Sequence, residues 1–134
     1  RRATLVDANV LIDVMTDDQE WGTWSRGALA DAADEGTLVI NPIVYSEASI
    51  RFSSVEALDE ALPADVYARE PLPWSAAFLA GKCFVEYRRR GGERRSPLPD
   101  FFIGAHAAVG GLVLLTRDAT RYASYFPTVR LVSP

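Results

Sequence analysis

The stretch TLVDANVLIDV (residues 4–14) contains two structural patterns in succession. Residues 4–6 form a short apolar run, which is typical of a buried strand, and this run ends at Asp7. From Asn9, which we expect to cap the next element, apolar residues recur at helical spacing as far as Val14. The stretch therefore predicts a strand that turns directly into a helix, with an acidic residue at the turn.

The rest of the chain repeats this alternation. Further strands are expected at residues 38–40, 112–116 and 129–132, with a minor strand at 67–69. Helices are expected at residues 21–35, from Pro42, from a capping box of Ser53 and Glu56 to about Leu62, at 74–90, from Asp100 to Gly110, and up to Tyr125. Strands separated by helical crossovers imply a three-layer α/β/α fold with a short, mostly parallel central sheet.

The composition is that of one compact globular domain, which we expect to span residues 1–134. The chain is 49% hydrophobic and 24% charged. Its apolar stretches are broken before they could cross a bilayer, and no basic-then-apolar leader precedes the first strand, so we expect a soluble, cytoplasmic protein without membrane contact. The single cysteine, Cys83, lies in an apolar context and is expected to be a buried thiol.

Four acidic residues lie where a strand turns into a helix, or in the first turns of that helix: Asp7, Glu47, Asp100 and Asp118. The carboxyl ends of parallel strands lie along one edge of a sheet, so these residues should converge in one crevice. Carboxylates gathered in this way repel one another unless a hard divalent cation neutralises them. The pattern predicts a metal site, and oxygen ligands alone favour Mg²⁺ or Mn²⁺.

Each acid also has a structural interpretation. An aspartate at a strand end is often a turn former or helix cap, and Asp100 could simply stabilise the positive end of a helix dipole. A glutamate inside a helix usually faces solvent, although Val44 and Ala48 on the same side suggest that Glu47 leans inward. Asp13 could face the same crevice, but a solvated position on its helix is at least as consistent, so we leave it out of the site.

His106, the single histidine, is expected to be structural. It lies six residues from Asp100, about 240° around a helix, so the two residues cannot share a face. Without a second histidine or a pair of cysteines a zinc site has no ligand set, and Ser-His-Asp chemistry lacks its nucleophile motif.

Four segments together resemble the signature regions of PIN-domain ribonucleases, especially the toxin subunits of VapBC-type toxin–antitoxin pairs, including the FitB-like branch. The segments are VDANVLID (6–13), NPIVYSE (41–47), LPDFFIGAHA (98–107) and LLTRDATRY (114–122). The resemblance implies an acidic quartet of Asp7, Glu47, Asp100 and Asp118, with Asn9 and Thr116 as polar supports. It also implies a PIN-like fold, a Mg²⁺ or Mn²⁺ cofactor, an RNA substrate and an antitoxin partner.

The resemblance gives each acid of the quartet an expected role. Asp7, Asp100 and Asp118 are expected to be direct metal ligands, while Glu47 holds a second ion or a water molecule. The chain would then be a metal-dependent endoribonuclease, because bound metal can activate water and stabilise charge on a phosphodiester.

Basic residues gather in one segment of this acidic chain, whose net charge is -4. The segment contains Arg88, Arg89, Arg90, Arg94 and Arg95 around a Gly-Gly break. Arginine forks match phosphate oxygens, so the segment could bind RNA, although a solvated helix end would also fit. Aromatic residues expected on outer helices (Trp21, Trp24, Trp74 and Phe78) favour a homodimer that also binds an antitoxin chain.

Other classes fit less well. A HAD-like phosphohydrolase also has an aspartate after its first strand, but it needs a second one two residues on, where this chain has Asn9. Its usual lysine has no counterpart either, and a receiver domain fails on similar grounds. The non-enzymatic alternative is a catalytically silent PIN-like subunit that binds an antitoxin and supports operator DNA binding. The intact acids argue against a silent site.

Overall fold

The computed structural model describes residues 2–92 and 98–134, and within them five parallel strands form one sheet in the order β3-β2-β1-β4-β5. The strands are β1 (Thr4–Val6), β2 (Leu38–Ile40), β3 (Tyr67–Arg69), β4 (Val113–Leu115) and β5 (Leu131–Val132). The parallel sheet and the minor strand at 67–69 were both predicted, but the last strand is shorter than expected. Each of the first four strands is followed by a helical crossover, as parallel pairing requires.

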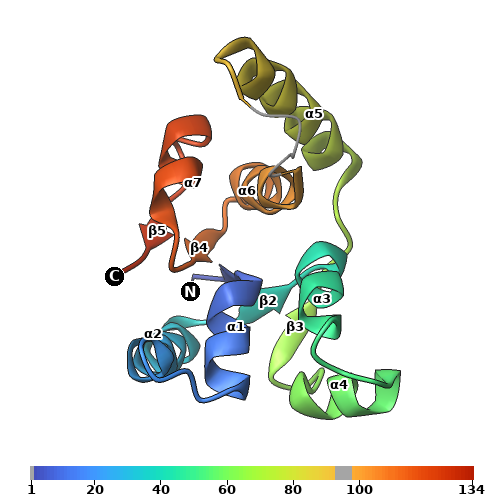
Figure 1. Ribbon diagram of the computed structural model, residues 1–134, viewed down its shortest axis with the longest axis vertical. Coiled ribbons are helices and arrows are strands. Elements are labelled where there is room, and N and C mark those ends of the chain that lie inside the picture. The colour runs from blue at the N-terminus through green and yellow to red at the C-terminus, as the bar shows by residue number, and fades with distance from the viewer. Residues whose placement is uncertain (1, 93–97) are drawn as a thin grey trace.

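Helices cover both faces of the sheet in a three-layer arrangement, as Figure 1 shows. In the described residues they are α1 (Ala8–Met15), α2 (Gly22–Glu35), α3 (Pro42–Ser49), α4 (Val55–Ala61), α5 (Trp74–Arg89), α6 (Leu98–Gly110) and α7 (Ala119–Tyr125). The first four lie on one side of the sheet and the last three on the other. This division follows from strand order, because the chain moves outward from β1 to β3 and then returns past β1 to β4.

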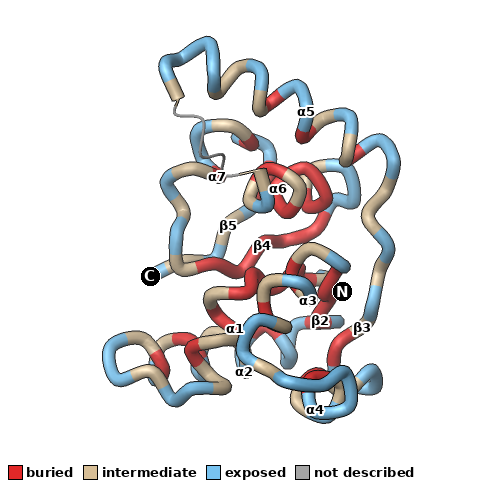
Figure 2. The backbone as a smooth tube through the Cα atoms, turned by 45° about the vertical axis from the view of Figure 1, so that its right-hand side comes forward, coloured by how far each residue is buried: buried red, intermediate tan, exposed pale blue. Residues whose placement is uncertain are grey.

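The core is formed by the central strands and by α6. Strands β1, β2 and β4 are buried at every residue, which explains their continuous apolar runs. Helix α6 is buried at six positions and lies between α5, α7 and the sheet, so it is apolar almost all round (Figures 1 and 2). Cys83 is buried on the inner side of α5, as expected.

Three helix starts differ from the sequence prediction. Asp7, not Asn9, is the N-cap of α1, and its carboxylate accepts a hydrogen bond from the Ala8 N–H. Ser54, not Ser53, caps α4 by accepting from the Ala57 N–H. Helix α6 begins at Leu98 rather than at Asp100, which places Asp100 within the first turn.

Two of the aromatic residues expected on the surface are in fact half-buried. Trp24 packs against the core, and the guanidinium of Arg117 lies 5.5 Å from the ring of Trp21. Trp74 and Phe78 on α5 are 92% and 69% exposed, so the prediction of surface aromatic residues was correct for these two alone. Within the described residues, no helix is long and apolar enough to cross a membrane.

Candidate functional site

The candidate site lies at the carboxyl ends of β1 and β4, where the chain changes sides of the sheet. After β1 it enters α1 on one face, and after β4 it enters α7 on the other (Figure 1). Such a switch point leaves a crevice between the two connections, which is where open α/β sheets bind ligands. Asp7 and Thr116 occupy this crevice because each directly follows its strand.

Asp7 is held at the bottom of the crevice by donors from three elements. Its Oδ1 accepts from the Ala8 N–H at 2.7 Å, and its Oδ2 accepts from the hydroxyls of Thr116 at 2.8 Å and Tyr122 at 3.0 Å. The pKa of Asp7 is raised to about 6, mainly by burial and also by the charge of Asp100, against the opposing effect of these hydrogen bonds. Asp7 is therefore an acid whose negative charge is poorly solvated but well oriented.

Glu47 faces the same crevice from α3, as its position beside Val44 and Ala48 predicted. Together with Asp7, Asn9, Asp100 and other residues it lines a hollow of about 320 Å³. The pKa of Glu47 is raised to about 7, first by burial and then by the charges of Asp7 and Asp100. The solvated interpretation of Glu47 was wrong, because its Oε1 is buried and has no hydrogen-bond partner among the described residues.

Asp100 enters the crevice from the first turn of α6. Each of its oxygens lies against a group of α7: Arg121 Nη1 is 2.9 Å from Oδ2, and the Tyr122 hydroxyl, which can donate to either Asp100 or Asp7, is 3.3 Å from Oδ1. Tyr122 thus links Asp100 to Asp7. Burial and the charges of Asp7 and Asp100 raise the pKa of Tyr122 above its usual value, so its hydroxyl keeps its proton and serves as a donor.

Asp118 lies beside this group rather than within the same hollow. It lines a neighbouring hollow of about 370 Å³ with Thr120, Arg121, Ser124 and Tyr125. The link to Asp7 runs through Thr116, whose Oγ1 donates to Asp7 and accepts from the Asp118 N–H at 3.1 Å. The structure therefore brings three of the four predicted acids to one hollow and places the fourth next to it.

Both predicted polar supports contact this network. Asn9 Nδ2 lies 3.5 Å from Asp7 Oδ2 and from Thr116 Oγ1, and Asn9 Oδ1 accepts from the Arg117 N–H at 3.2 Å. Asn9 and Thr116 thus connect the turn after β1 to the turn after β4. They can fix the orientation of the Asp7 carboxylate, which is what supporting residues do in metal sites.

Asp13 is neither part of the crevice nor solvated. It is buried, accepts a hydrogen bond from Ser25 Oγ at 2.7 Å, and forms an ion pair with Arg117 Nε at 2.7 Å. This cluster ties α1 and α2 to the turn that carries Asp118. The sequence left Asp13 open between the crevice and a solvated position; it occupies neither, because the distant Arg117 supplies its partner.

His106 has the structural role that the sequence predicted. It is buried, and its Nδ1 lies 3.0 Å from Asn41 Nδ2. Because Asn41 Oδ1 already accepts from the Val44 N–H, its amide group donates to His106, whose Nε2 then faces Glu70 Oε1 at 3.2 Å. None of these contacts involves the acidic quartet.

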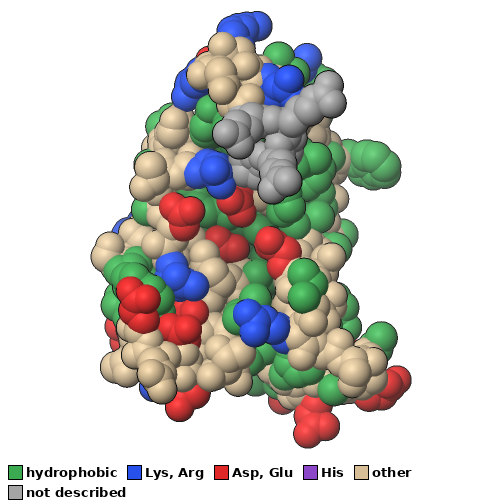
Figure 3. All heavy atoms as spheres, viewed as in Figure 1, with side chains coloured by type: hydrophobic (Ala, Val, Ile, Leu, Met, Phe, Trp, Pro, Cys, Tyr) green, Lys and Arg blue, Asp and Glu red, His purple; other side chains and the backbone are tan. Residues whose placement is uncertain are grey.

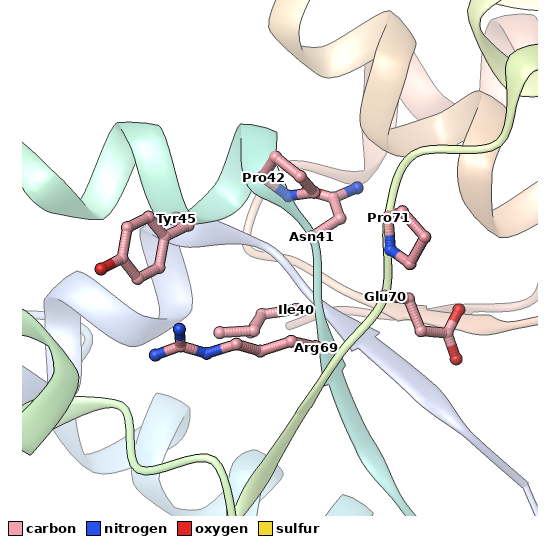
Figure 4. A pocket seen from close by; sticks show the side chains of 7 residues that line it. All are labelled: Ile40, Asn41, Pro42, Tyr45, Arg69, Glu70 and Pro71. Atoms are coloured by element: carbon pink, nitrogen blue, oxygen red, sulfur yellow. The ribbon is translucent and has the colours of Figure 1, made fainter.

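A separate hollow of about 250 Å³ at the ends of β2 and β3 contains none of the four acids. In Figure 4, Arg69 and Tyr45 point to one side of this hollow and Glu70 points to the other. Arg69 pairs with Asp59 and Glu70 with His106, so the polar groups on its rim are already engaged. This hollow has no set of converging polar groups comparable to the acidic crevice.

The predicted arginine segment is only partly described. Arg94 and Arg95 lie outside the described residues, and Arg88 is exposed at the end of α5. Arg89 and Arg90 pair with Glu86, and Arg90 also packs over the Tyr125 ring and donates to Ser124. Arg90 therefore joins α5 to α7, a structural role that the sequence did not predict.

The acids of the crevice have the chemistry of a divalent cation site. A buried carboxylate oxygen without a partner, such as Glu47 Oε1, is a position where a cation or a hydrogen-bond donor can bind. The raised pKa values of Asp7 and Glu47 show that the crevice resists holding its full negative charge. Among the described residues, no three Asp, Glu, His or Cys side chains are arranged closely enough to hold a metal ion. The oxygens of Asp100 instead lie against Arg121 and Tyr122.

Figure 3 shows the consequence on the surface, where acidic side chains gather around the hollowed centre of this face with basic side chains beside them.

Three residues near the acids were not predicted as site residues: Tyr122, Arg121 and Arg51. Arg51 is exposed and lines the same hollow as Glu47. The sequence did contain a signal for Arg121 and Tyr122. They lie about one helical turn after Asp118, so a helix that begins there places both side chains on the side of the crevice.

Comparisons with known proteins identify the family and the fold. Residues 4–124 match the model of the PIN domain family. The fold is similar to that of VapBC2 from Rickettsia felis bound to promoter DNA (TM-score 0.73, 16% identity, 98% of each chain covered). It is also similar to VapBC-1 from nontypeable Haemophilus influenzae (TM-score 0.71, 16% identity, covering 98% of this chain and 97% of that one). A third similar structure is FitAcB from Neisseria gonorrhoeae (TM-score 0.65, 17% identity, covering 96% of this chain and 95% of that one). No curated protein sequence matches the chain.

Proposed function

This chain belongs to the PIN domain family, and from that premise we propose that it is a Mg²⁺- or Mn²⁺-dependent endoribonuclease and the toxin of a type II toxin–antitoxin system. The observation that carries the proposal is the buried, unpartnered Oε1 of Glu47, in a hollow that it shares with Asp7 and Asp100. A protein rarely leaves such an oxygen without a donor or cation unless the site binds something.

Asp7, Asp100 and Asp118 would hold the cation, which supplies a nucleophilic water and neutralises charge on the phosphate when bound. Thr116 and the Ala8 N–H each fix one oxygen of Asp7, so that carboxylate is oriented in advance. Glu47 Oε1 would hold a second ion or hydrogen-bond a water. Because no nucleophilic side chain is needed, His106 takes no part.

Similar folds come from toxin–antitoxin complexes, and we extend that assignment to this chain. The partners would be an antitoxin chain and a second copy of the toxin, and the substrate would be cytoplasmic RNA. The arginine segment that begins at Arg88 would bind phosphates of the RNA strand, since exposed guanidinium groups suit that ligand.

A second candidate function follows from the similar Rickettsia felis complex, which was solved with promoter DNA. In that case the chain would be a silent subunit that binds an antitoxin and supports operator binding. The two functions differ in cleavage: a silent subunit should bind its antitoxin but cut no RNA at any metal concentration.

The test is sequencing of RNA ends after induced expression in cells, together with cleavage by the purified chain. Wild type should produce defined new ends, and EDTA should abolish cleavage. Asp7→Asn and Asp100→Asn should lower the rate by orders of magnitude, whereas His106→Gln, assayed below its melting temperature, should retain most of it. Equal loss in a folded His106→Gln protein, or cleavage that survives in Asp7→Asn, would contradict the assignment.

A further inference from the structure

Two adjacent residues of α7 lie against the two oxygens of Asp100. Arg121 Nη1 is 2.9 Å from Oδ2, and the hydroxyl of Tyr122 is 3.3 Å from Oδ1. The same hydroxyl lies 3.0 Å from Asp7 Oδ2, but it has one proton and can donate to only one carboxylate at a time. Arg121 is thus the cation that this structure places against Asp100 itself.

The position of Arg121 allows it to leave. Its side chain is 34% exposed, that of Asp100 is 29% exposed, and the pair lies at the rim of the crevice rather than at its bottom. Arg121 also lines the neighbouring hollow with Asp118. A small rotation could therefore move the guanidinium from Asp100 to that hollow without breaking the core contacts of α7, which run through buried Tyr122.

We propose that Arg121 is an internal counter-ion: it pairs with Asp100 in the metal-free protein, competes with a divalent cation for Oδ2, and once displaced binds a phosphate of the RNA from the adjacent hollow. This inference rests on the proposed function, because it concerns the cation expected at Asp100. A guanidinium and a metal ion cannot share one carboxylate oxygen without strong repulsion. The displaced guanidinium is always charged and has the fork geometry that phosphate accepts.

The inference predicts that one substitution, Arg121→Gln, strengthens the binding of Mn²⁺ and weakens the binding of RNA. In Arg121→Gln, Mn²⁺ should bind about two- to fivefold more tightly, the size expected when a partly exposed ion pair is removed. The KM for a short single-stranded RNA at saturating Mn²⁺ should rise with little change in kcat. A variant that merely disturbs α7 would weaken both kinds of binding.

Titration calorimetry with Mn²⁺ alone measures the first effect and needs no catalysis. Arg26→Gln is the matched control, because Arg26 forms an exposed pair with Asp17 at 2.8 Å and should leave Mn²⁺ binding unchanged. Arg121→Lys should restore most of the RNA affinity, because the positive charge is kept. In EDTA, Arg121→Gln should melt below wild type, and saturating Mn²⁺ should remove the difference.

The outcomes separate this inference from the function on which it rests. If wild type binds Mn²⁺ and Arg121→Gln binds it no more tightly, Arg121 is not a competing counter-ion, while the metal site stands. Tighter Mn²⁺ binding with an unchanged KM would also overturn the proposal, because the phosphate role would be missing. If wild type binds no Mn²⁺ and Asp100→Asn behaves identically, the proposed function itself fails.

Discussion

At the scale of single residues, Glu47 shows most clearly that the acids form one electrostatic unit. Its pKa is raised to about 7 first by burial and then by Asp7 and Asp100, which come from two other elements. A solvated glutamate would show no such coupling. For Asp7, Glu47 and Asp100, an interpretation as isolated turn or helix residues therefore does not account for the group.

The first prediction follows from the direction of these shifts. A carboxyl whose pKa is higher in the folded state binds more protons there, so the free energy of unfolding falls as pH rises from the unfolded to the folded pKa. For Glu47 that window runs from 4.5 to about 7, and for Asp7 from 3.8 to about 6. Metal-free wild type should therefore lose stability between about pH 4 and pH 7 through these two groups.

Glu47→Gln provides the matched comparison, since it removes one titrating group and keeps the shape of the side chain. In EDTA at pH 8 the variant should melt above wild type, and the two should converge near pH 4. Saturating Mg²⁺ should raise the melting temperature of wild type more than that of the variant. Parallel melting curves at every pH, with and without metal, would show that Glu47 is not coupled to the crevice.

Sequence reasoning found the acids because each follows a strand or lies in the first turns of the next helix, and the parallel sheet then brings strand ends together. It missed Arg121 and Tyr122, since their contacts depend on how α7 packs on α6. It misjudged Asp13 for the same reason, because the partner Arg117 lies about a hundred residues away in the chain. Local spacing cannot specify such distant pairs.

At the scale of elements, strand order and the helical crossovers were predictable, but helix starts were not always placed correctly. Both Ser53 and Ser54 could cap α4, and the capping-box pattern favoured Ser53. The structure selects Ser54, which has an extended backbone and accepts from Ala57 N at 3.1 Å. The two adjacent serines have equal propensity to cap a helix. Which of them becomes the N-cap is decided by the backbone conformation of the segment that leads into α4.

This correction is testable with two neighbouring substitutions. Ser54→Ala should lower the free energy of unfolding by about 1 kcal/mol, the usual cost of losing an N-cap side chain. Ser53→Ala should have a much smaller effect. Urea unfolding of both variants measures the difference, and equal effects, or a larger one at Ser53, would restore the capping box predicted from the sequence.

Gly104 on α6 shows a second effect of packing at this scale. A Cβ at this position would lie 2.3 Å from the ring of Phe126. The close neighbour is therefore the aromatic residue that follows α7. Gly81 on α5 has no atom within 4 Å of the corresponding position.

The two glycines should respond to alanine in opposite directions. Gly104→Ala should destabilise the protein by about 1–3 kcal/mol, because the methyl group overlaps a buried ring. Gly81→Ala should stabilise it by about 0.5–1 kcal/mol, because alanine favours a helix interior. Denaturant melts of both variants check this pair, and a neutral or stabilising Gly104→Ala would mean that Phe126 moves aside easily.

At the scale of the whole molecule, the exposed face of α5 stands apart from the acidic crevice. Trp74, Phe78 and Val85 are 92%, 69% and 52% exposed and lie at helical spacings of four and seven residues, which places them along one side of the helix. The opposite side of α5 packs on α6 through buried Ala76, Ala80 and Cys83. A monomer rarely leaves an aromatic stripe of this kind in water.

The last prediction is that this stripe, defined as Trp74, Phe78 and Val85, forms a homodimer interface. A symmetric dimer uses the same patch on both copies, and one helix face with an aromatic end and a small Gly81 near its middle can pair with itself in antiparallel orientation. Trp74→Ser with Phe78→Ser should convert the dimer to a monomer in light scattering at micromolar concentration, with the circular dichroism spectrum unchanged. Val55→Ser, which changes a 61% exposed residue on α4, should leave the dimer intact. A monomeric wild type would rule out the interface, and a double variant that remains dimeric would move it to another face.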